Sequence, residues 1–382
     1  MDTARPRWDI FCKVVDNFGD AGVCWRLARL LCMEHGLRVR LWIDHLPTLQ
    51  ALCPAVDPAL GVQHVDGMDI RHWHGTAVPA VAEAGVVIEA FGCGLPEAYI
   101  EQMAACTRSP VWIVLEYLSA ESWVDSHHGL ASPHPRLPLQ RYFFFPGFTS
   151  DTGGLLREAD LIERREQFNA AQRLAFWREA GFDLPAGLTV SLFAYTDAPV
   201  GDWLAVLAEG SEPVVVAVPA GAAWLAARSF FETREELAAG RWCRGRLEVR
   251  QLPFLPQTRY DELLWACDLN MVRGEDSLVR AQWAARPLIW QPYRQDAEAH
   301  RRKLDAFLDR YGCGLATDAR AALETFWRCW NGFEACALAQ AWQDLRAAEP
   351  ELFCHARRWA RNLADLPEMA AQLVEFVRNK VE

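Results

Sequence analysis

Short apolar runs alternate with amphipathic helical patterns along this chain, and the alternation starts twice. In the first half, apolar runs at residues 8–15, 37–43, 86–91 and 111–115 predict buried strands, and residues 23–34 predict an amphipathic helix. Alternating strands and helices indicate a mainly parallel sheet that is covered by helices on both faces. We therefore expect an α/β fold.

The same pattern begins again near residue 183, after a loop-rich stretch at 126–146 and a helical stretch at about 161–180. The second set of predicted strands lies at residues 188–194, 214–218, 247–252, 269–272 and 288–291. A chain of 382 residues that is 51% hydrophobic is long for one core and can bury two sheets. We expect two Rossmann-like, doubly wound domains at residues 1–180 and 183–358, which face each other across a cleft. Ligands of such folds bind at the carboxyl ends of the strands.

Composition restricts the partners and the compartment. The net charge is −11 and no long run of Lys or Arg occurs, which argues against binding to nucleic acid through its phosphates. An acidic surface favours a basic partner. No apolar stretch has the length of a membrane span, and no signal peptide is apparent, so we expect a soluble, cytoplasmic protein without membrane contact. The 12 cysteines show no CxxC spacing, and we expect reduced thiols.

The first candidate site is the loop that leaves the first predicted strand, Asp16-Asn17-Phe18-Gly19-Asp20. Glycine lets the backbone turn tightly, and the helix that follows presents an N-terminus that favours an anion. That anion is either an Asp of the loop itself or a substrate phosphate. Alternatively, Asp16 or Asp20 only caps the helix.

The second candidate site is Arg273-Gly274-Glu275-Asp276-Ser277, between a predicted strand and the next helix. A glycine, an arginine and a helix N-terminus together suit a diphosphate. The two acidic residues would repel phosphate, so they either face sugar or nucleoside hydroxyls or are bridged by a metal. We favour the version without metal, because no DxD-type pair and no histidine lies near them. A simple capped helix start explains Asp276 and Ser277 but not Arg273.

The third candidate group is aromatic. Phe193 and Tyr195 follow one strand of the second half, and Phe254 and Gln257 follow another. Aromatic faces stack on nucleobases, and a Gln amide can hydrogen-bond to a base edge or a ribose. Each aromatic taken singly also fits core packing. GxGxxG, Walker and HExxH motifs are absent from the sequence, which argues against nicotinamide, P-loop and zinc-protease chemistry.

Together these loops resemble the protein-arginine rhamnosyltransferase family that modifies elongation factor P. The resemblance spans nearly the whole chain and is carried by residues 8–20, 22–29, 145–148, 152–155, 253–257 and 273–277. It implies a GT-B glycosyltransferase, in which a last helix, at about residues 360–382, crosses back to complete the first domain. The second domain would bind the donor, dTDP-β-L-rhamnose. The acceptor would be an arginine side chain of elongation factor P, and transfer would invert the anomeric carbon.

Carried over by motif, the resemblance implies that Asp20 is the general base and that Asp16 and Glu275 are essential partners. The donor would be held by Asn17, Phe18, Gly19, Phe193, Tyr195, Phe254, Gln257, Arg273, Gly274, Asp276 and Ser277. The nucleotide sugar is a co-substrate, and neither a cofactor nor a metal is expected.

Two other functions were weighed against this one. A GT-B transferase or epimerase acting on another nucleotide sugar, for example a lipid-linked one, would usually carry a basic, apolar patch in its first half, and none is found. A non-catalytic nucleotide-sugar-binding module would not need carboxylates at the carboxyl ends of both sheets.

Overall fold

The computed structural model describes residues 6–16, 18–73, 84–231, 240–295 and 298–381, and the chain divides into two compact units. Unit 1 comprises Met1–Ala159 and Asp365–Glu382, and unit 2 comprises Asp160–Ala364. The helical stretch that we assigned to the first domain therefore belongs to the second unit. It packs there because Phe176 and Trp177 are buried against Leu252 and Leu263.

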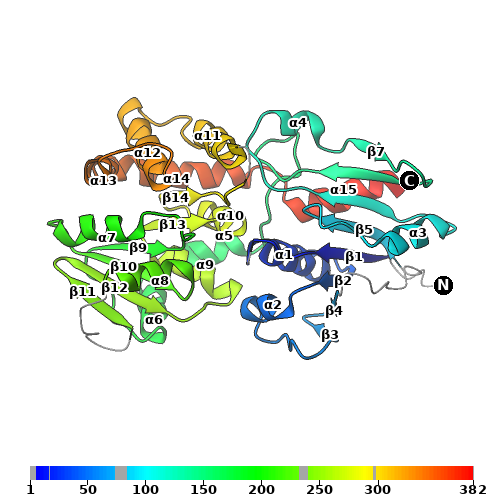
Figure 1. Ribbon diagram of the computed structural model, residues 1–382, viewed down its shortest axis with the longest axis horizontal. Helices are drawn as coiled ribbons and strands as arrows, with labels where there is room; N and C mark the ends of the chain where they lie inside the picture. Colours follow the sequence, from blue (N-terminus) through cyan, green and yellow to red (C-terminus); the bar gives the residue numbers. More distant parts are fainter. Residues whose placement is uncertain (1–5, 17, 74–83, 232–239, 296–297, 382) are drawn as a thin grey trace. The chain divides into compact units, whose positions relative to one another are not determined.

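Unit 1 is built on an eight-stranded sheet with the order β3-β4-β2-β1-β5-β6-β8-β7 (Figure 1). Its strands are β1 (Arg7–Cys12), β2 (Arg38–Ile43), β3 (Val62–Val65), β4 (Met68–His72), β5 (Ala84–Ala90), β6 (Val111–Leu115), β7 (Ala131–Pro133) and β8 (Gln140–Phe144). Its helices are α1 (Gly19–Met33), α2 (Leu46–Leu52), α3 (Glu97–Ala105), α4 (Trp123–His127) and α15 (Met369–Val381). The central strands are parallel, and the outer pairs β3–β4 and β7–β8 are antiparallel.

Unit 2 has a six-stranded sheet with the order β11-β12-β10-β9-β13-β14. Its strands are β9 (Leu188–Leu192), β10 (Val214–Pro219), β11 (Arg241–Arg244), β12 (Leu247–Leu252), β13 (Leu269–Arg273) and β14 (Leu288–Gln291). Its helices are α5 (Leu161–Gln167), α6 (Ala170–Glu179), α7 (Val200–Glu209), α8 (Ala222–Ser229), α9 (Gln257–Ala266), α10 (Asp276–Trp283), α11 (Ala299–Tyr311), α12 (Thr317–Trp330), α13 (Leu338–Ala347) and α14 (Glu349–Ala364). The predicted strands of both halves are confirmed to within a few residues.

One feature of unit 1 was not predicted. Residues 126–146, expected to be loop-rich, also contain the β7–β8 pair. Three prolines concealed it, but proline is tolerated on an edge strand, and Pro133 ends the edge strand β7. The predicted helix at 161–180 is two helices, because Asn169 caps a new start: its side chain accepts the backbone N–H groups of Ala171 and Gln172.

The last helix completes unit 1, and Figure 1 draws α15 in red beside cyan strands of this unit, although it lies at the other end of the sequence. The Phe376 ring packs edge-on against Phe144 and Tyr142 of β8. Gly154 allows the C-terminal segment to approach, since a Cβ there would lie 2.3 Å from the carbonyl oxygen of Pro367, and its φ is +70°.

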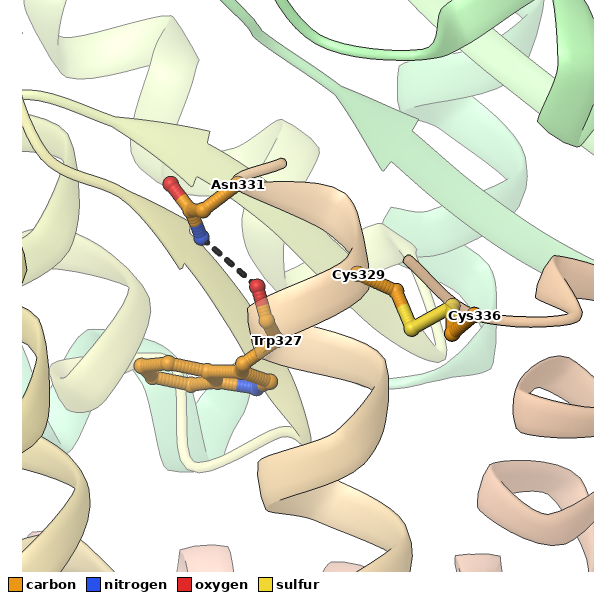
Figure 2. Close-up of a disulfide and its surroundings, with 4 residues drawn as sticks. All are labelled: Trp327, Cys329, Asn331 and Cys336. Atoms are coloured by element: carbon orange, nitrogen blue, oxygen red, sulfur yellow. Dashed lines mark hydrogen bonds between the residues drawn. A yellow bond between two sulfur atoms is a disulfide. The ribbon is translucent and has the colours of Figure 1, made fainter. Parts of the chain in front are cut away.

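A disulfide between Cys329 and Cys336 closes the turn after α12 (Figure 2). The expectation that all thiols are reduced is therefore wrong for this pair; ten other cysteines are free. Within the turn, Asn331 Nδ2 donates to the carbonyl of Trp327, as Figure 2 shows, and also to that of Trp290 in β14, each at 2.9 Å. The turn is thereby attached to the edge of the sheet. Within the described residues, no helix has the length and apolarity needed to cross a membrane.

Candidate functional site

In unit 1, the polar residues after β1 form a closed loop around Asp20. Asp20 lies in the first turn of α1 and is 2% exposed. Its Oδ2 accepts the backbone N–H groups of Val15 and Asp16, each at 2.8 Å. The N-cap of α1 is Phe18, and no side chain caps that helix. The alternative that an Asp serves only as the helix cap is therefore wrong, and Asp20 instead closes the loop that precedes the helix.

The other oxygen of Asp20 meets Tyr117, which stacks on Phe91, and we predicted neither aromatic residue. Tyr117 donates its hydroxyl to Asp20 Oδ1 at 3.3 Å, and its ring stacks on Phe91 at 4.5 Å between centroids. The two rings follow neighbouring strands, β5 beside β1 and β6 beside β5. Phe91 has a φ of +57°, which is rare for a non-glycine residue. The available signal was position, because Phe91 and Tyr117 directly follow the carboxyl ends of β5 and β6.

The environment of the Asp20 carboxyl group favours its protonated form. Burial raises the pKa of Asp20, and the nearby Asp44 carboxylate raises it further. The hydrogen bonds from the two backbone amides and from Tyr117 oppose this rise, but the net direction is upward. A carboxylate with a raised pKa accepts a proton more readily than an ordinary aspartate, as a general base must.

Asp16 and Gly19 fit together within the same loop. A Cβ at Gly19 would lie 2.7 Å from Asp16 Oδ2, so the Asp16 carboxylate can occupy this position because residue 19 has no side chain. The Gly19 N–H also donates to the Asp16 carbonyl at 2.6 Å. Phe18 is partly buried beside them. Asn17, the remaining predicted residue of this loop, lies outside the described residues.

In unit 2, the predicted donor residues gather where the chain reverses its direction of strand addition. The chain runs from β9 outward through β10 to β12 and then returns to β13 on the other side of β9. Such switch points are the usual ligand sites of doubly wound sheets. Here the Arg273 guanidinium, at the end of β13, lies 4.4 Å from the ring centroid of Phe193 and 4.2 Å from that of Tyr195. Stacking between rings fixes the plane of a guanidinium.

The turn after Arg273 leads directly into α10. Gly274 has a φ of +63°, a conformation that favours glycine. The Ser277 hydroxyl accepts the Arg273 N–H at 3.1 Å and donates to the Arg273 carbonyl. These bonds hold the N-terminus of α10, where backbone N–H groups favour an anion.

The acidic residues of this turn are paired with neighbouring side chains. Gln257, the first residue of α9 and 4% exposed, donates to Asp276 Oδ2 at 3.3 Å. Lys303 of α11 donates to Glu275 Oε1 at 3.4 Å, a contact that we did not predict. Phe254 lies partly buried on the loop that precedes Gln257. Lys303 thus offsets one of the two charges that would repel a diphosphate.

No cluster of three or more His, Cys, Asp or Glu side chains that could hold a metal occurs among the residues whose structure is described. The predicted residues of the first loop lie in unit 1, whereas Phe193, Tyr195, Phe254, Gln257 and the Arg273–Ser277 turn lie in unit 2. Each unit therefore carries one cluster at the carboxyl edge of its own sheet.

Residues 8–378 match the family described as elongation factor P (EF-P) rhamnosyltransferase EarP. The chain belongs to this family. It is 50% identical to a protein-arginine rhamnosyltransferase of Pseudomonas putida over 99% of this chain and 100% of that protein. It is 46% identical to one from Pseudomonas aeruginosa over 97% of this chain and 98% of that protein.

Solved structures agree with this membership. A structure described as the basis for EarP-mediated arginine glycosylation of EF-P matches with a TM-score of 0.67 and 37% identity, over 98% of this chain and 99% of that one. A UDP-bound transferase from Siraitia grosvenorii matches with a TM-score of 0.53 at 11% identity, over 98% and 100% of the two chains, and shows the fold alone. The GT-B fold predicted from the sequence is thereby confirmed.

Proposed function

We propose that this chain moves L-rhamnose from dTDP-β-L-rhamnose to an arginine side chain of translation elongation factor P, with inversion at the anomeric carbon. The observation that carries the proposal is the full-length match, at 50% identity, to a protein-arginine rhamnosyltransferase. The two clusters at the sheet edges support it, because one offers a base and the other offers groups suited to a nucleoside diphosphate.

The donor binds to unit 2 in this proposal. Phe193, Tyr195 and Phe254 supply aromatic faces for the base, and Gln257 supplies an amide. Arg273 and the N-terminus of α10, at Gly274, Asp276 and Ser277, stabilise the departing diphosphate. The stack on Phe193 and Tyr195 supports this role, because it holds the guanidinium of Arg273 in one orientation before the donor arrives.

The acceptor binds to unit 1, where Asp20 acts as the general base. A guanidinium has a pKa well above that of a carboxylate, and full proton transfer before reaction would cost about 12 kcal/mol. Asp20 therefore first orients the guanidinium by charge-assisted hydrogen bonds. The proton passes to Asp20 Oδ1 as the C–N bond forms, since Oδ2 already accepts two backbone amides.

Asp16 and Glu275 assist this chemistry from their respective units. Asp16 adds negative charge near an oxocarbenium-like centre, and Gly19 makes room for it. Glu275, paired with Lys303, faces donor hydroxyls. Phe18 and Gly19 contribute to donor binding in this proposal, and Asn17, predicted for the same role, lies outside the described residues. We place the enzyme in the cytoplasm, where the translation factor acts.

Intact-mass spectrometry of elongation factor P tests the whole proposal. The factor is mixed with the purified chain and dTDP-β-L-rhamnose, and one deoxyhexose adduct on an arginine is expected. A factor whose arginine is replaced by lysine is the matched control and should stay unmodified. Donor hydrolysis or epimerisation without an adduct would instead support a GT-B enzyme for another acceptor, and binding without turnover would support a non-catalytic module.

A further inference from the structure

Gln291, the last residue of β14, joins the two loops of the proposed donor site. Its side chain is buried, with 3% of the residue exposed. Oε1 accepts the backbone N–H of Tyr195 at 2.8 Å, and Nε2 donates to Asp197 Oδ1 at 2.8 Å. Its carbonyl oxygen accepts the Gly274 N–H at 3.0 Å. One residue therefore contacts the loop after β9 and the turn after β13.

The strand order explains why this link needs a side chain. β13 lies between β9 and β14, so the backbones of β9 and β14 are about 10 Å apart and cannot pair directly. The Gln291 side chain spans the end of β13 and reaches the β9 loop. Trp290, its neighbour, donates from Nε1 to the Gly274 carbonyl at 2.7 Å, so both the N–H and the C=O of Gly274 are hydrogen-bonded to residues of β14.

The chemistry at this point requires an amide. A backbone N–H can only donate and a carboxylate can only accept, so these partners fix which Gln291 atom is oxygen and which is nitrogen. Glutamate would place a second carboxylate against Asp197, and methionine would leave the Tyr195 N–H buried without its partner. Asp197 also forms an ion pair with Arg294 at 3.5 Å.

The hydrogen bonds of Gln291 hold in place the aromatic rings that stack on Arg273. The Tyr195 backbone is fixed by Gln291, and the Tyr195 ring lies 4.2 Å from the Arg273 guanidinium. The turn that begins at Arg273 is fixed by the same residue through Gly274. If Gln291 releases its partners, the ring and the guanidinium separate.

We propose that Gln291 and Asp197 are a positioning pair that holds Tyr195 and Arg273 in the geometry that binds the diphosphate donor. The inference rests on the proposed function in one respect, namely that Tyr195 and Arg273 bind the donor. The pair acts through Tyr195 and Arg273, so its loss should lower donor affinity, and a displaced Arg273 would also stabilise the departing diphosphate less well.

A swap of the two side chains tests the pair. Gln291→Glu should weaken dTDP binding, measured by calorimetry, and raise the donor KM by about tenfold, because two carboxylates then face each other. Asp197→Asn alone should have little effect, since an Asn oxygen still accepts from Gln291. The double variant Gln291→Glu/Asp197→Asn restores a donor and an acceptor at the right places, and its dTDP affinity should return to within about threefold of wild type.

A matched control uses the same chemistry elsewhere in unit 2. Gln340 donates to Asp344 at 2.8 Å on α13, and Gln340→Glu should leave the dTDP affinity unchanged. If Gln291→Glu does not fold, Asp197→Ala, at a side chain that is 38% exposed, should still weaken dTDP binding.

Unaltered dTDP affinity in Gln291→Glu, or a double variant that binds no better than Gln291→Glu, would overturn the inference. A lower unfolding midpoint with dTDP affinity and donor KM unchanged would indicate a purely structural role and would overturn it as well. Calorimetry with dTDP needs no acceptor, so a wild-type protein that binds dTDP but does not transfer rhamnose would refute the proposed function and not the pair.

Discussion

The two oxygens of the Asp20 carboxylate have different roles, one in the structure of the loop and one in the proposed chemistry. Oδ2 closes the loop through two amides, and Oδ1 faces Tyr117. Removal of the whole side chain would therefore disturb the loop and the proposed base together. A substitution that keeps the acceptor oxygen for the two amides is needed to separate these roles.

Asp20→Asn is that substitution. The Asn oxygen can still accept from Val15 and Asp16, so the loop should persist, but an amide cannot take up the proton. We expect kcat to fall by about 10²–10⁴-fold while the donor affinity is nearly unchanged. Initial rates of transfer and calorimetry with dTDP measure the two effects. Robust transfer by this variant would remove Asp20 from the role of base.

Tyr117→Phe tests how the base is tuned. Because burial raises the pKa of Asp20, kcat/KM in wild type should decline already at a pH above the ordinary range of aspartate. The base works only when it is deprotonated, so activity is lost as the pH falls through this raised pKa. The Tyr117 hydroxyl stabilises the carboxylate, and its removal should move the acidic limb to higher pH.

The control for that shift is Tyr142→Phe, which deletes a hydroxyl bonded to Gln140 elsewhere in unit 1. Its pH profile should match that of wild type. Asp44 and Cys12, which interact electrostatically with Asp20, are retained in both variants, as is the backbone hydrogen bond from Asp16. An acidic limb that stays in place in Tyr117→Phe would mean that this hydroxyl does not act on the base.

At the scale of elements, the sequence predicted the parts with strong periodicity. The central strands of both sheets are buried apolar runs, and their positions set where each loop must lie. The edge pair β7–β8 was missed because proline and exposure conceal short edge strands. Phe91 and Tyr117 were missed because a partly buried aromatic residue after a strand looks like core packing in a sequence, and only the structure shows that Tyr117 contacts Asp20 and stacks on Phe91.

The turn closed by the disulfide gives a prediction at this scale. Cys329 and Cys336 are seven positions apart, and closing a loop of that length contributes about 2 kcal/mol to stability. A reductant should lower the free energy of unfolding in urea by that amount. Cys336→Ser, at an exposed position, should have the lower stability already and should not respond to the reductant. Equal midpoints with and without reductant in wild type would contradict the assignment.

The charges in the turn between β13 and α10 predict whether rhamnosyl transfer depends on a metal. We expect EDTA to leave the initial rate of rhamnosyl transfer unchanged, because Arg273 and the α10 N-terminus supply the positive charge for the diphosphate, and Lys303 offsets Glu275. Rates with and without EDTA measure this. A loss of activity that Mg²⁺ or Mn²⁺ restores would mean that Glu275 and Asp276 carry a cation.

For the whole molecule, the sequence predicted where the sheet of unit 2 begins but not which helices before it belong to that unit. The restart of the pattern near residue 183 marked the first strand of unit 2, but α5 and α6 precede that strand and already belong to unit 2. Which sheet a helix covers depends on tertiary burial, here of Phe176 and Trp177, and periodicity alone does not report it. The candidate site residues of the two units were predicted by motif, while the contacts that position them came from the structure.

The preference among donors tests the contacts of the base and those of the sugar. Phe193 and Phe254 offer apolar faces that can cover the thymine methyl, which uracil lacks. UDP should therefore compete less well than dTDP by about 1 kcal/mol, or about fivefold in inhibition constant. A hydroxyl restored at C6 of the sugar would be buried in the pocket for the rhamnose methyl, at a cost of about 1–3 kcal/mol if unpaired. Competition assays with dTDP, UDP and dTDP-linked hexoses measure both preferences.

Phe254→Ala should reduce the difference between the inhibition constants of dTDP and UDP, and it should leave the preference at C6 in place. If UDP competes as well as dTDP and Phe254→Ala changes neither constant, the loop before α9 does not bind the base.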